Sequence, residues 1–340
     1  MTIVAKSGGT SVANAAQCRK TVAIMRADKR RTNVVASAAG KRYPDDIKLT
    51  DTCERLHRQV AHRFPHADTE QLIYERYDEI AHGLGVAIDL RGEMDRMMAE
   101  LPAGASLDYA MSRGEYLSAK IMAKALDYAF VDAADCIRFD ENGRYVKDDQ
   151  LIRAAINGRR TVVPGYYGAM PDGSIKTFSR GGSDLTGAIV ARALGADLYE
   201  NWTDVSGLLM ASPHIVGNTR PIRVITYSEI RELSYMGASV FHEEAMFPVK
   251  QAGIMTRILN TNAPEDEGTL VVPDGSPLYE GGLIKGIAGR TRFTAITVEQ
   301  MLMDKEVGFG RRLLSIVEKA GVGFEHMPGG VDHLPLVIDE

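Results

Sequence analysis

The sequence from Phe178 to Ala188 reads Phe-Ser-Arg-Gly-Gly-Ser-Asp-Leu-Thr-Gly-Ala and follows a strand-like run, Thr161–Pro164, after a turn-rich segment. Its second half opens a helical pattern, because apolar residues recur at i, i+4 and i+8: Leu185, Ile189 and Ala193. Two adjacent glycines let the backbone approach a ligand closely, and a helix start offers unpaired N–H groups and a positive dipole to an anion. The stretch therefore predicts a ligand-binding turn between a strand and a helix.

Two charged side chains in this turn suit the two ends of an amino acid. Arg180 carries a planar, permanently charged fork that matches a carboxylate, and Asp184 offers an acceptor to an ammonium group. A structural alternative is that Ser183 or Asp184 simply caps the helix while the glycines make the turn.

The N-terminus repeats the strand–glycine turn–helix pattern. Thr2–Lys6 reads as a short buried strand, Ser7–Ser11 as a glycine turn, and a helix is expected from near Val12 or Ala13. Such a turn can cradle phosphate with backbone N–H groups, and Lys6 lies where its ammonium would reach that phosphate. Neither a Walker loop nor the dinucleotide fingerprint G-x-G-x-x-G occurs in the sequence.

A second buried strand, Asn33–Ser37, ends in another small-residue loop, Ala38–Lys41. Successive strands with a helix between them predict an α/β fold with an open, mainly parallel sheet sandwiched by helices. In such sheets ligands bind beyond the carboxyl ends of the strands, which is where the glycine turns lie.

The bulk properties are those of an ordinary globular chain. Its 340 residues favour two domains, and 45% of them are hydrophobic. A net charge of −5 without a basic run argues against nucleic-acid binding, and no apolar stretch is long enough for a membrane span. Three widely spaced cysteines, Cys18, Cys53 and Cys136, suit reduced thiols in the cytoplasm better than a disulfide framework.

Several ordered motifs together resemble the aspartokinases. Lys6-Ser-Gly-Gly-Thr-Ser11 is similar to the family's K-F-G-G-[TS]-S, and Ser179-Arg-Gly-Gly-Ser-Asp184 is similar to its G-R-G-G-S-D. Further matching segments follow in the family's order along nearly the whole chain: Ala36–Lys41, Ser112–Glu115, Asn201–Gly207, Leu233–His242, Asn260–Asn262 and Gly268–Leu270. The resemblance implies the amino-acid kinase fold and ATP-dependent phosphorylation of the β-carboxylate of L-aspartate, the first step toward lysine, threonine and methionine.

The resemblance also implies roles for particular residues. Catalysis is expected from Lys6 and Asp184 with the turn glycines Gly8 and Gly9. Glu115, placed in the first turn of a helix, is expected to contact the substrate ammonium. The other expected substrate-binding residues are Thr50, Tyr166, Arg180 and Ser183. ATP, with Mg²⁺, is expected to contact Lys6, Gly9, Ser11, Thr203, Asp204 and Ser239. No metal site made by the protein alone is expected.

Three positions depart from the family pattern. Ser7 replaces the customary Phe, His214 an Arg, and Ser239 a Lys, which puts the nucleotide contacts in question. Two alternatives follow: another amino-acid kinase of this fold, acting on glutamate or a nucleoside monophosphate, or a catalytically silent amino-acid-binding relative.

The C-terminal part resembles an ACT regulatory module. After the catalytic domain (1–275), residues 284–340 predict a βαββ order: Phe293–Val298, Phe309–Ala320, Val322–Glu325 and Leu334–Ile338. The family usually carries two such modules, so residues 284–340 are expected to be a partial one in a truncated or unusually short chain. The resemblance further implies lysine or threonine as a feedback ligand there, and a homodimer or higher homo-oligomer.

Overall fold

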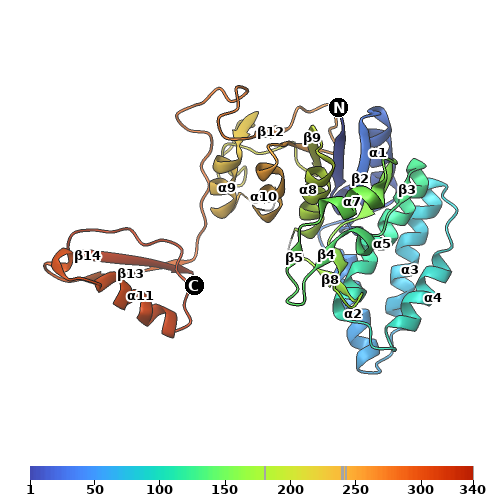
Figure 1. Cartoon of the computed structure of the whole chain (residues 1–340), viewed down its shortest axis with the longest axis horizontal. Coiled ribbons are helices and arrows are strands. Elements are labelled where there is room, and N and C mark those ends of the chain that lie inside the picture. The colour runs from blue at the N-terminus through green and yellow to red at the C-terminus, as the bar shows by residue number, and fades with distance from the viewer. Residues whose placement is uncertain (180, 239–240, 242, 340) are drawn as a thin grey trace. The chain divides into compact units, whose positions relative to one another are not determined.

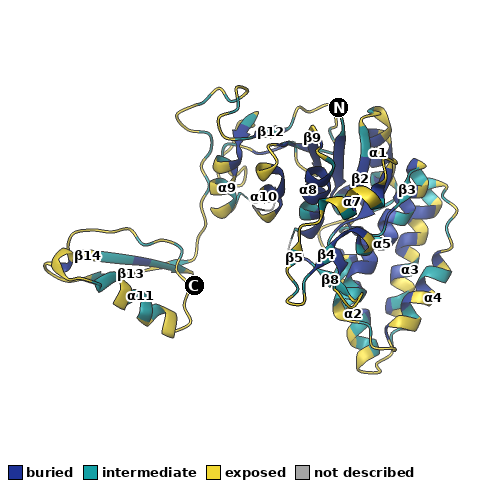
Figure 2. Ribbon diagram, in the orientation of Figure 1, coloured by how far each residue is buried: buried dark blue, intermediate teal, exposed yellow. Residues whose placement is uncertain are grey.

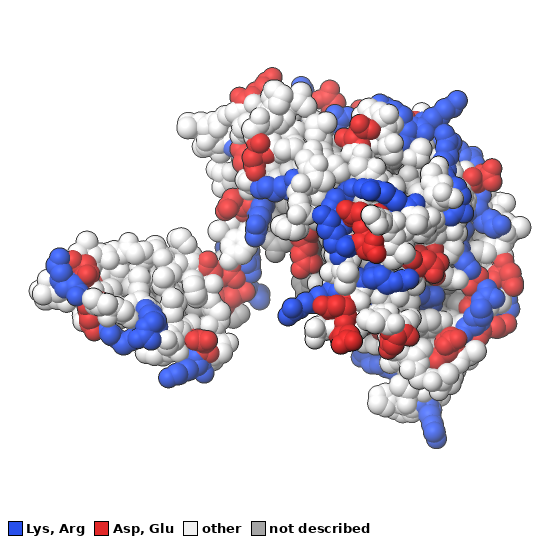
Figure 3. Space-filling view, in the orientation of Figure 1, with Lys and Arg blue, Asp and Glu red and all other residues white. Residues whose placement is uncertain are grey.

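The structure is a computed structural model that describes residues 1–179, 181–238, 241 and 243–339. The chain divides into two compact units, Met1–Ile287 and Ala288–Glu340. Among the described residues, no helix is both long enough and apolar enough to span a membrane. Acidic and basic side chains alternate over the face of the molecule seen in Figure 3.

A large sheet with the strand order β10-β12-β11-β9-β1-β2-β6-β3 forms the centre of the first unit (Figure 1). Neighbouring strands are parallel except for the β11–β12 pair, which is antiparallel. The strands are β1 (Ile3–Ser7), β2 (Arg31–Ala36), β3 (Ala129–Phe130), β6 (Thr161–Pro164), β9 (Leu198–Thr203), β10 (Val224–Thr226), β11 (Met255–Asn260) and β12 (Thr269–Val272). The predicted α/β class with a mainly parallel sheet is confirmed. Parallel strands joined through helices have their carboxyl ends along one edge of the sheet.

Helices cover both faces of this sheet. Successive strand residues point to opposite sides, so Val4 packs into one hydrophobic core and Ala5 into the other. Figure 2 shows the strands between these layers as the most deeply buried elements. The helices are α1 (Ala15–Ala27), α2 (Leu49–Ala61), α3 (Ala67–Leu84), α4 (Leu90–Glu100), α5 (Leu107–Leu126), α6 (Ala133–Cys136), α7 (Asp149–Ile156), α8 (Gly182–Leu194), α9 (Tyr227–Tyr235) and α10 (Glu243–Gln251).

The first helix begins later than the sequence predicts. A 3-10 turn, Thr10–Val12, follows the glycine turn, and α1 begins at Ala15. The Asn14 side chain caps α1 by accepting a hydrogen bond from Gln17 N. A residue with this capping geometry has extended backbone dihedrals, which separates the turn from the helix.

A small second sheet leads the chain into α8. It has the order β5-β4-β7-β8, with β4 (Arg138–Phe139), β5 (Tyr145–Val146), β7 (Tyr167–Ala169) and β8 (Ile175–Thr177). The β7–β8 hairpin returns the chain from the end of β6 to Phe178, directly before the glycines of α8.

The second unit consists of β13 (Phe293–Glu299), a 3-10 turn (Met303–Lys305), α11 (Phe309–Lys319) and β14 (His333–Asp339). β13 and β14 pair antiparallel along their full length. The predicted strand Val322–Glu325 is wrong: only an isolated bridge, His326 with Val337, forms in that region. Glycines at 321 and 323 disfavour an extended ladder there, and Gly321 has a φ of 68°.

Candidate active site

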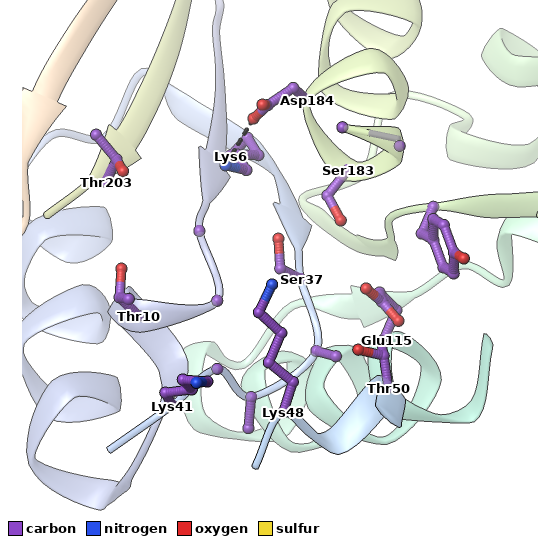
Figure 4. A pocket seen from close by; sticks show the side chains of 18 of the residues that line it. Lys6, Thr10, Ser37, Lys41, Lys48, Thr50, Glu115, Ser183, Asp184 and Thr203 are labelled. Carbon is purple, nitrogen blue, oxygen red and sulfur yellow. Dashed lines mark ion pairs between the residues drawn. The ribbon is translucent and has the colours of Figure 1, made fainter. Parts of the chain in front are cut away.

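A cavity of about 530 Å³ opens at the carboxyl ends of β1, β2 and β9 (Figure 4). It is walled by the glycine turn after β1, the loop after β2, the middle of α5 and the start of α8. Many residues expected to bind or react line it together: Lys6, Gly8, Gly9, Thr50, Glu115, Tyr166, Ser183, Asp184, Thr203 and Asp204. Residues from sequence positions nearly two hundred apart thus meet at one sheet edge.

Lys6 is fixed at the end of β1 by two neighbours. Its Nζ lies 2.6 Å from Asp184 Oδ1 and 3.2 Å from Asn201 Oδ1. The Asn201 amide in turn donates to Asp184 Oδ1 at 3.2 Å. All three side chains are largely shielded from solvent, so the ammonium is held by a charge-assisted contact in one position. Asn201, on β9, completes a cluster that the motif comparison described only through Lys6 and Asp184.

The first glycine turn and the loop after β2 are closely packed. A Cβ on Gly8 would lie 3.2 Å from Trp202 O and 3.3 Å from Lys6 Nζ, and Gly8 N donates to Trp202 O at 2.8 Å. A Cβ on Gly40 would lie only 2.6 Å from Gly9 C, and Gly40 N donates to Gly9 O at 2.8 Å. The loops after β1 and β2 therefore pack backbone against backbone, which only glycine permits.

Glu115 lies in the middle of α5, not in a first helical turn as expected. The helix begins at Leu107, capped by Ser106, so the local dipole of its N-terminus does not explain this carboxylate. The Glu115 side chain is buried, and its Oε2 has no hydrogen-bond partner. Burial raises the pKa of Glu115 to about 8, an effect that backbone hydrogen bonds, chiefly at Ala38, and the Arg113 guanidinium only partly offset. Glu115 lines the cavity, and a buried carboxylate with an unpartnered oxygen is chemically suited to receive a cation.

The start of α8 is shaped by close backbone contacts. Gly181, at the N-cap position, has a left-handed conformation with φ 59°, and no side chain caps the helix. The alternative in which Ser183 or Asp184 is the cap is therefore wrong; the Asp184 carboxylate is directed to Lys6 instead. A Cβ on Gly182 would lie 2.6 Å from Tyr166 Cδ2, so this glycine admits the aromatic ring beside the helix start.

Tyr166 itself has an unusual backbone, with φ 80°. Its N–H donates to Thr186 Oγ1 at 3.0 Å and its carbonyl accepts from Phe178 N at 2.8 Å. Strained residues of this kind persist only where surrounding contacts fix them, and they cluster at functional sites. Two other expected residues, Arg180 and Ser239, lie outside the described residues.

The nucleotide-side residues Thr203 and Asp204 sit at the end of β9. Thr203 Oγ1 donates to Asp204 Oδ1 at 3.2 Å, and the Thr203 carbonyl accepts from Thr261 N at 2.9 Å. Ser11 differs from them: it is buried, its Oγ lies 2.7 Å from Thr261 Oγ1, and it does not line the cavity. The structure thus gives Ser11 a bracing contact between the first turn and the end of β11, not an exposure to ligand.

Thr50 lies in the first turn of α2 and lines the cavity, but it does not cap that helix. The residue at the cap position is Lys48, which makes no side-chain capping bond. Further lining residues escaped the sequence reasoning: Thr10, Ser37, Lys41, Lys48 and Met111. The rule that ligands bind beyond the carboxyl ends of parallel strands already places Ala38–Lys41 at the binding edge, but it assigns no role to single side chains there.

Comparisons with known proteins agree with the architecture. Residues 1–260 match the model of the amino acid kinase family. Aspartokinase 3 of Bacillus subtilis is 37% identical over 98% of this chain and 77% of its own length. The crystal structure of Clostridium acetobutylicum aspartate kinase superimposes with a TM-score of 0.92 at 46% identity, over 99% of this chain and 78% of that one.

A more distant solved structure, Escherichia coli aspartokinase III in complex with aspartate and ADP, has the same fold, with a TM-score of 0.78 at 23% identity. It is matched over 100% of this chain and 79% of its own. The resemblance inferred from the ordered motifs is confirmed. The chain therefore belongs to the amino acid kinase family and, within it, to the aspartokinases.

Proposed function

We propose that this chain catalyses the reaction ATP + L-aspartate → ADP + 4-phospho-L-aspartate. The observation that carries the proposal is that one cavity combines a site for an ammonium group at one end with a site for phosphate at the other. At one end Glu115 presents a buried carboxylate oxygen without a partner, and at the other the Lys6–Asp184 pair adjoins a glycine turn. The relatives named aspartokinase, at 37% and 46% identity, support the same reaction.

The Glu115 end suits the α-amino group of the substrate. An ammonium would supply the missing hydrogen bond to Oε2 and compensate the charge of the buried carboxylate. Thr50 and Ser183 offer hydroxyl groups on the same side of the cavity (Figure 4), and Tyr166 also lines it. We assign the substrate α-carboxylate to Arg180 on the strength of the sequence motif.

The Lys6 end suits the triphosphate. Gly8 and Gly9 line this end of the cavity without side chains to obstruct phosphate oxygens, and the ammonium of Lys6 lies beside Gly8. Thr203 and Asp204 at the end of β9 are assigned to the nucleotide, as is Ser239 from the sequence motif.

Mg²⁺ enters this scheme as part of the substrate Mg-ATP. No group of three His, Cys, Asp or Glu side chains that could bind a metal is found in the described part of the chain. Mg²⁺ commonly binds one or two protein carboxylates together with substrate phosphates. Asp204, a cavity carboxylate without a lysine partner in the described residues, would hold it and so help neutralise the phosphate charge.

Transfer of the phosphoryl group requires alignment and charge neutralisation rather than proton removal. The attacking β-carboxylate is already ionised near neutral pH. Glu115 and the α8 start would orient aspartate, while Lys6 stabilises the negative charge on the moving group. Asp184 and Asn201 keep the Lys6 ammonium at the end of β1 during transfer.

The test is aspartate-dependent ADP release, measured beside capture of the acyl phosphate by hydroxylamine. Wild type should form both products, and Lys6→Ala should form neither at a comparable rate. Glutamate and UMP are offered as rival acceptors, which tests the related-kinase alternative. A folded wild-type protein that binds aspartate and Mg-ATP without releasing ADP would support the silent-relative alternative and refute the proposal.

We further propose that residues 284–340 are a partial ACT regulatory domain, with 1–275 as the catalytic domain. Feedback by lysine or threonine at that region and a homodimeric or higher assembly are the accompanying hypotheses. Inhibition of ADP release by either amino acid, and the mass of the particle in solution, test them separately.

A further inference from the structure

The cavity contains a lysine that the assignments above do not use. Lys6 is already paired with Asp184, and Lys41 Nζ donates to Pro44 O at 3.0 Å. Lys48 also lines the cavity, and no hydrogen bond or ion pair engages its Nζ among the described residues. In Figure 4 the amino end of Lys48 reaches toward Ser37, between Lys6 and Glu115.

The backbone of Lys48 is firmly placed although its side chain is exposed. It immediately precedes α2, and its carbonyl accepts hydrogen bonds from Thr52 N at 3.0 Å and Thr52 Oγ1 at 3.1 Å. Leu49, the next residue, is buried in the core. Lys48 thus enters the cavity from the same helical turn as Thr50, on the side opposite β1.

A buried ion-pair network ties down the loop that leads to Lys48. Asp46 accepts from Arg42 N and Nε, each at 2.9 Å, and from Arg76 Nη1 at 2.9 Å. Arg76, on α3, also donates to the carbonyl of Gly40 through Nη2 at 2.6 Å. One side chain on α3 therefore holds both ends of the loop, at Gly40 and at Asp46.

This network is costly to disturb. Asp46 and Arg76 are both buried, at 8% and 5% exposure, and the guanidinium groups of Arg42 and Arg76 keep the pKa of Asp46 well below its usual range. Breaking a buried pair leaves an uncompensated charge, so the loop has one strongly preferred arrangement. A buried cluster of this strength beside a cavity is consistent with a need for fixed geometry there.

We propose that Lys48 is a second catalytic cation, which contacts the negative oxygens where the β-carboxylate meets the γ-phosphoryl group, and that Arg76 is its positioning residue through Asp46. The inference rests on the proposed kinase function and deepens it. Lys6 is partly neutralised by its own carboxylate partner, so a second ammonium would add to the stabilisation of charge that builds on the transferring group. Of the three cavity lysines, Lys6 pairs with a carboxylate and Lys41 bonds to the Pro44 carbonyl, whereas no partner engages the amino group of Lys48 in the described structure.

The first experiment replaces Lys48 by Met and measures kcat and KM for aspartate and Mg-ATP. Loss of one electrostatic contact to the transition state is expected to lower kcat about 10²- to 10³-fold, with smaller changes in both KM values. Lys147→Met, which removes an exposed lysine outside this cavity, is the matched control for the lost charge. Unchanged kcat in Lys48→Met, alongside an active wild type, overturns the inference while leaving the proposed function intact. An inactive wild type instead indicates failure of the function itself.

A chemical rescue separates the ammonium from the fold. Lys48→Cys, alkylated with 2-bromoethylamine, regains an ammonium at nearly the length of lysine, whereas the native cysteines are buried. Alkylation is expected to raise kcat of the variant about tenfold or more. A fully alkylated, folded protein without recovery contradicts a role for the charge.

The positioning role is tested by a double-mutant cycle. Arg76→Met should lower kcat strongly in the wild-type background but by less than about threefold in the Lys48→Met background, because positioning matters only when the lysine is present. Equal losses in both backgrounds would show that Arg76 acts on the fold alone. Arg76→Lys keeps one charge near Asp46 and replaces Arg76→Met if that variant does not fold. The kcat of Arg76→Lys should be higher than that of Asp46→Asn.

Discussion

Aspartate binding should release a proton, because Glu115 must ionise to hold the substrate ammonium. Burial raises the pKa of this carboxyl to about 8, so the free protein at pH 7 has only about one molecule in eleven with an ionised Glu115. If the bound state requires the carboxylate, observed affinity at pH 7 is about tenfold below its limiting value, or about 1.4 kcal/mol. The dissociation constant should fall about tenfold from pH 6 to 7 and level off above pH 8.

Calorimetric titration of aspartate in two buffers with different ionisation enthalpies measures this directly. At pH 7 the two heats should differ by the equivalent of about 0.9 proton released per aspartate bound. Glu115→Gln should bind more weakly and with no proton release, while Glu141→Gln, an exposed carboxylate in a turn, should behave like the wild type. Wild-type affinity that is constant between pH 6 and 8, with equal heats in both buffers, would refute the assignment of Glu115 to the ammonium.

The remaining predictions concern the walls of the cavity. Lys6→Met should abolish hydroxamate formation and destabilise the fold by about 3 kcal/mol, because Asp184 loses its buried partner; adding Asp184→Asn should restore the urea midpoint but not the activity. Gly40→Ala should cost about 1–3 kcal/mol and lower kcat, since the new methyl group would lie 2.6 Å from Gly9 C; an unchanged melting temperature and rate would contradict the packing described. Ser11→Ala should lose about 1 kcal/mol of stability with its buried hydrogen bond, while a raised KM for ATP would show that it binds nucleotide after all. In unfolding experiments without substrate, raising the pH from 5 to 8 should lower the stability of the wild type by roughly 3 kcal/mol more than that of Glu115→Gln. The pKa of Glu115 is higher in the folded than in the unfolded protein. Its protonated form therefore stabilises the fold below the unfolded-state pKa, and this stabilisation is lost as the pH rises toward 8.

The strand and glycine patterns were readable from the sequence because their causes are local. A buried run of apolar residues ending in small residues predicts both a strand and a turn, as the stretches ending at Lys6 and Ser37 illustrate. The glycines at 8 and 9 are needed where backbones touch, and the motif order located them correctly in the cavity wall.

Other features depended on contacts between distant segments. Helix α5 begins at Leu107, eight residues before Glu115, and nothing in the local pattern near Glu115 excluded a start at 112. The contact of Ser11 with Thr261 could not be predicted from the sequence, because the two residues are 250 positions apart. The sequence gives no reason to single out Lys48, because a lysine before an amphipathic helix usually lies in solvent, and only the Asp46–Arg76 pair shows how this loop is held beside the cavity.

The chain contains a single tryptophan, Trp202, and its carbonyl accepts the Gly8 N–H at the end of β9. Its indole is buried, donates from Nε1 to Glu200 Oε2 at 2.8 Å and lies 5.2 Å from the guanidinium of Arg31. Indole emission responds to nearby charge and polarity, and no second tryptophan contributes a background. The intrinsic fluorescence of the unlabelled protein is therefore an optical probe of the end of β9 beside Thr203. Stopped-flow recording of the indole emission would measure the rate of nucleotide binding separately from the rate of phosphoryl transfer.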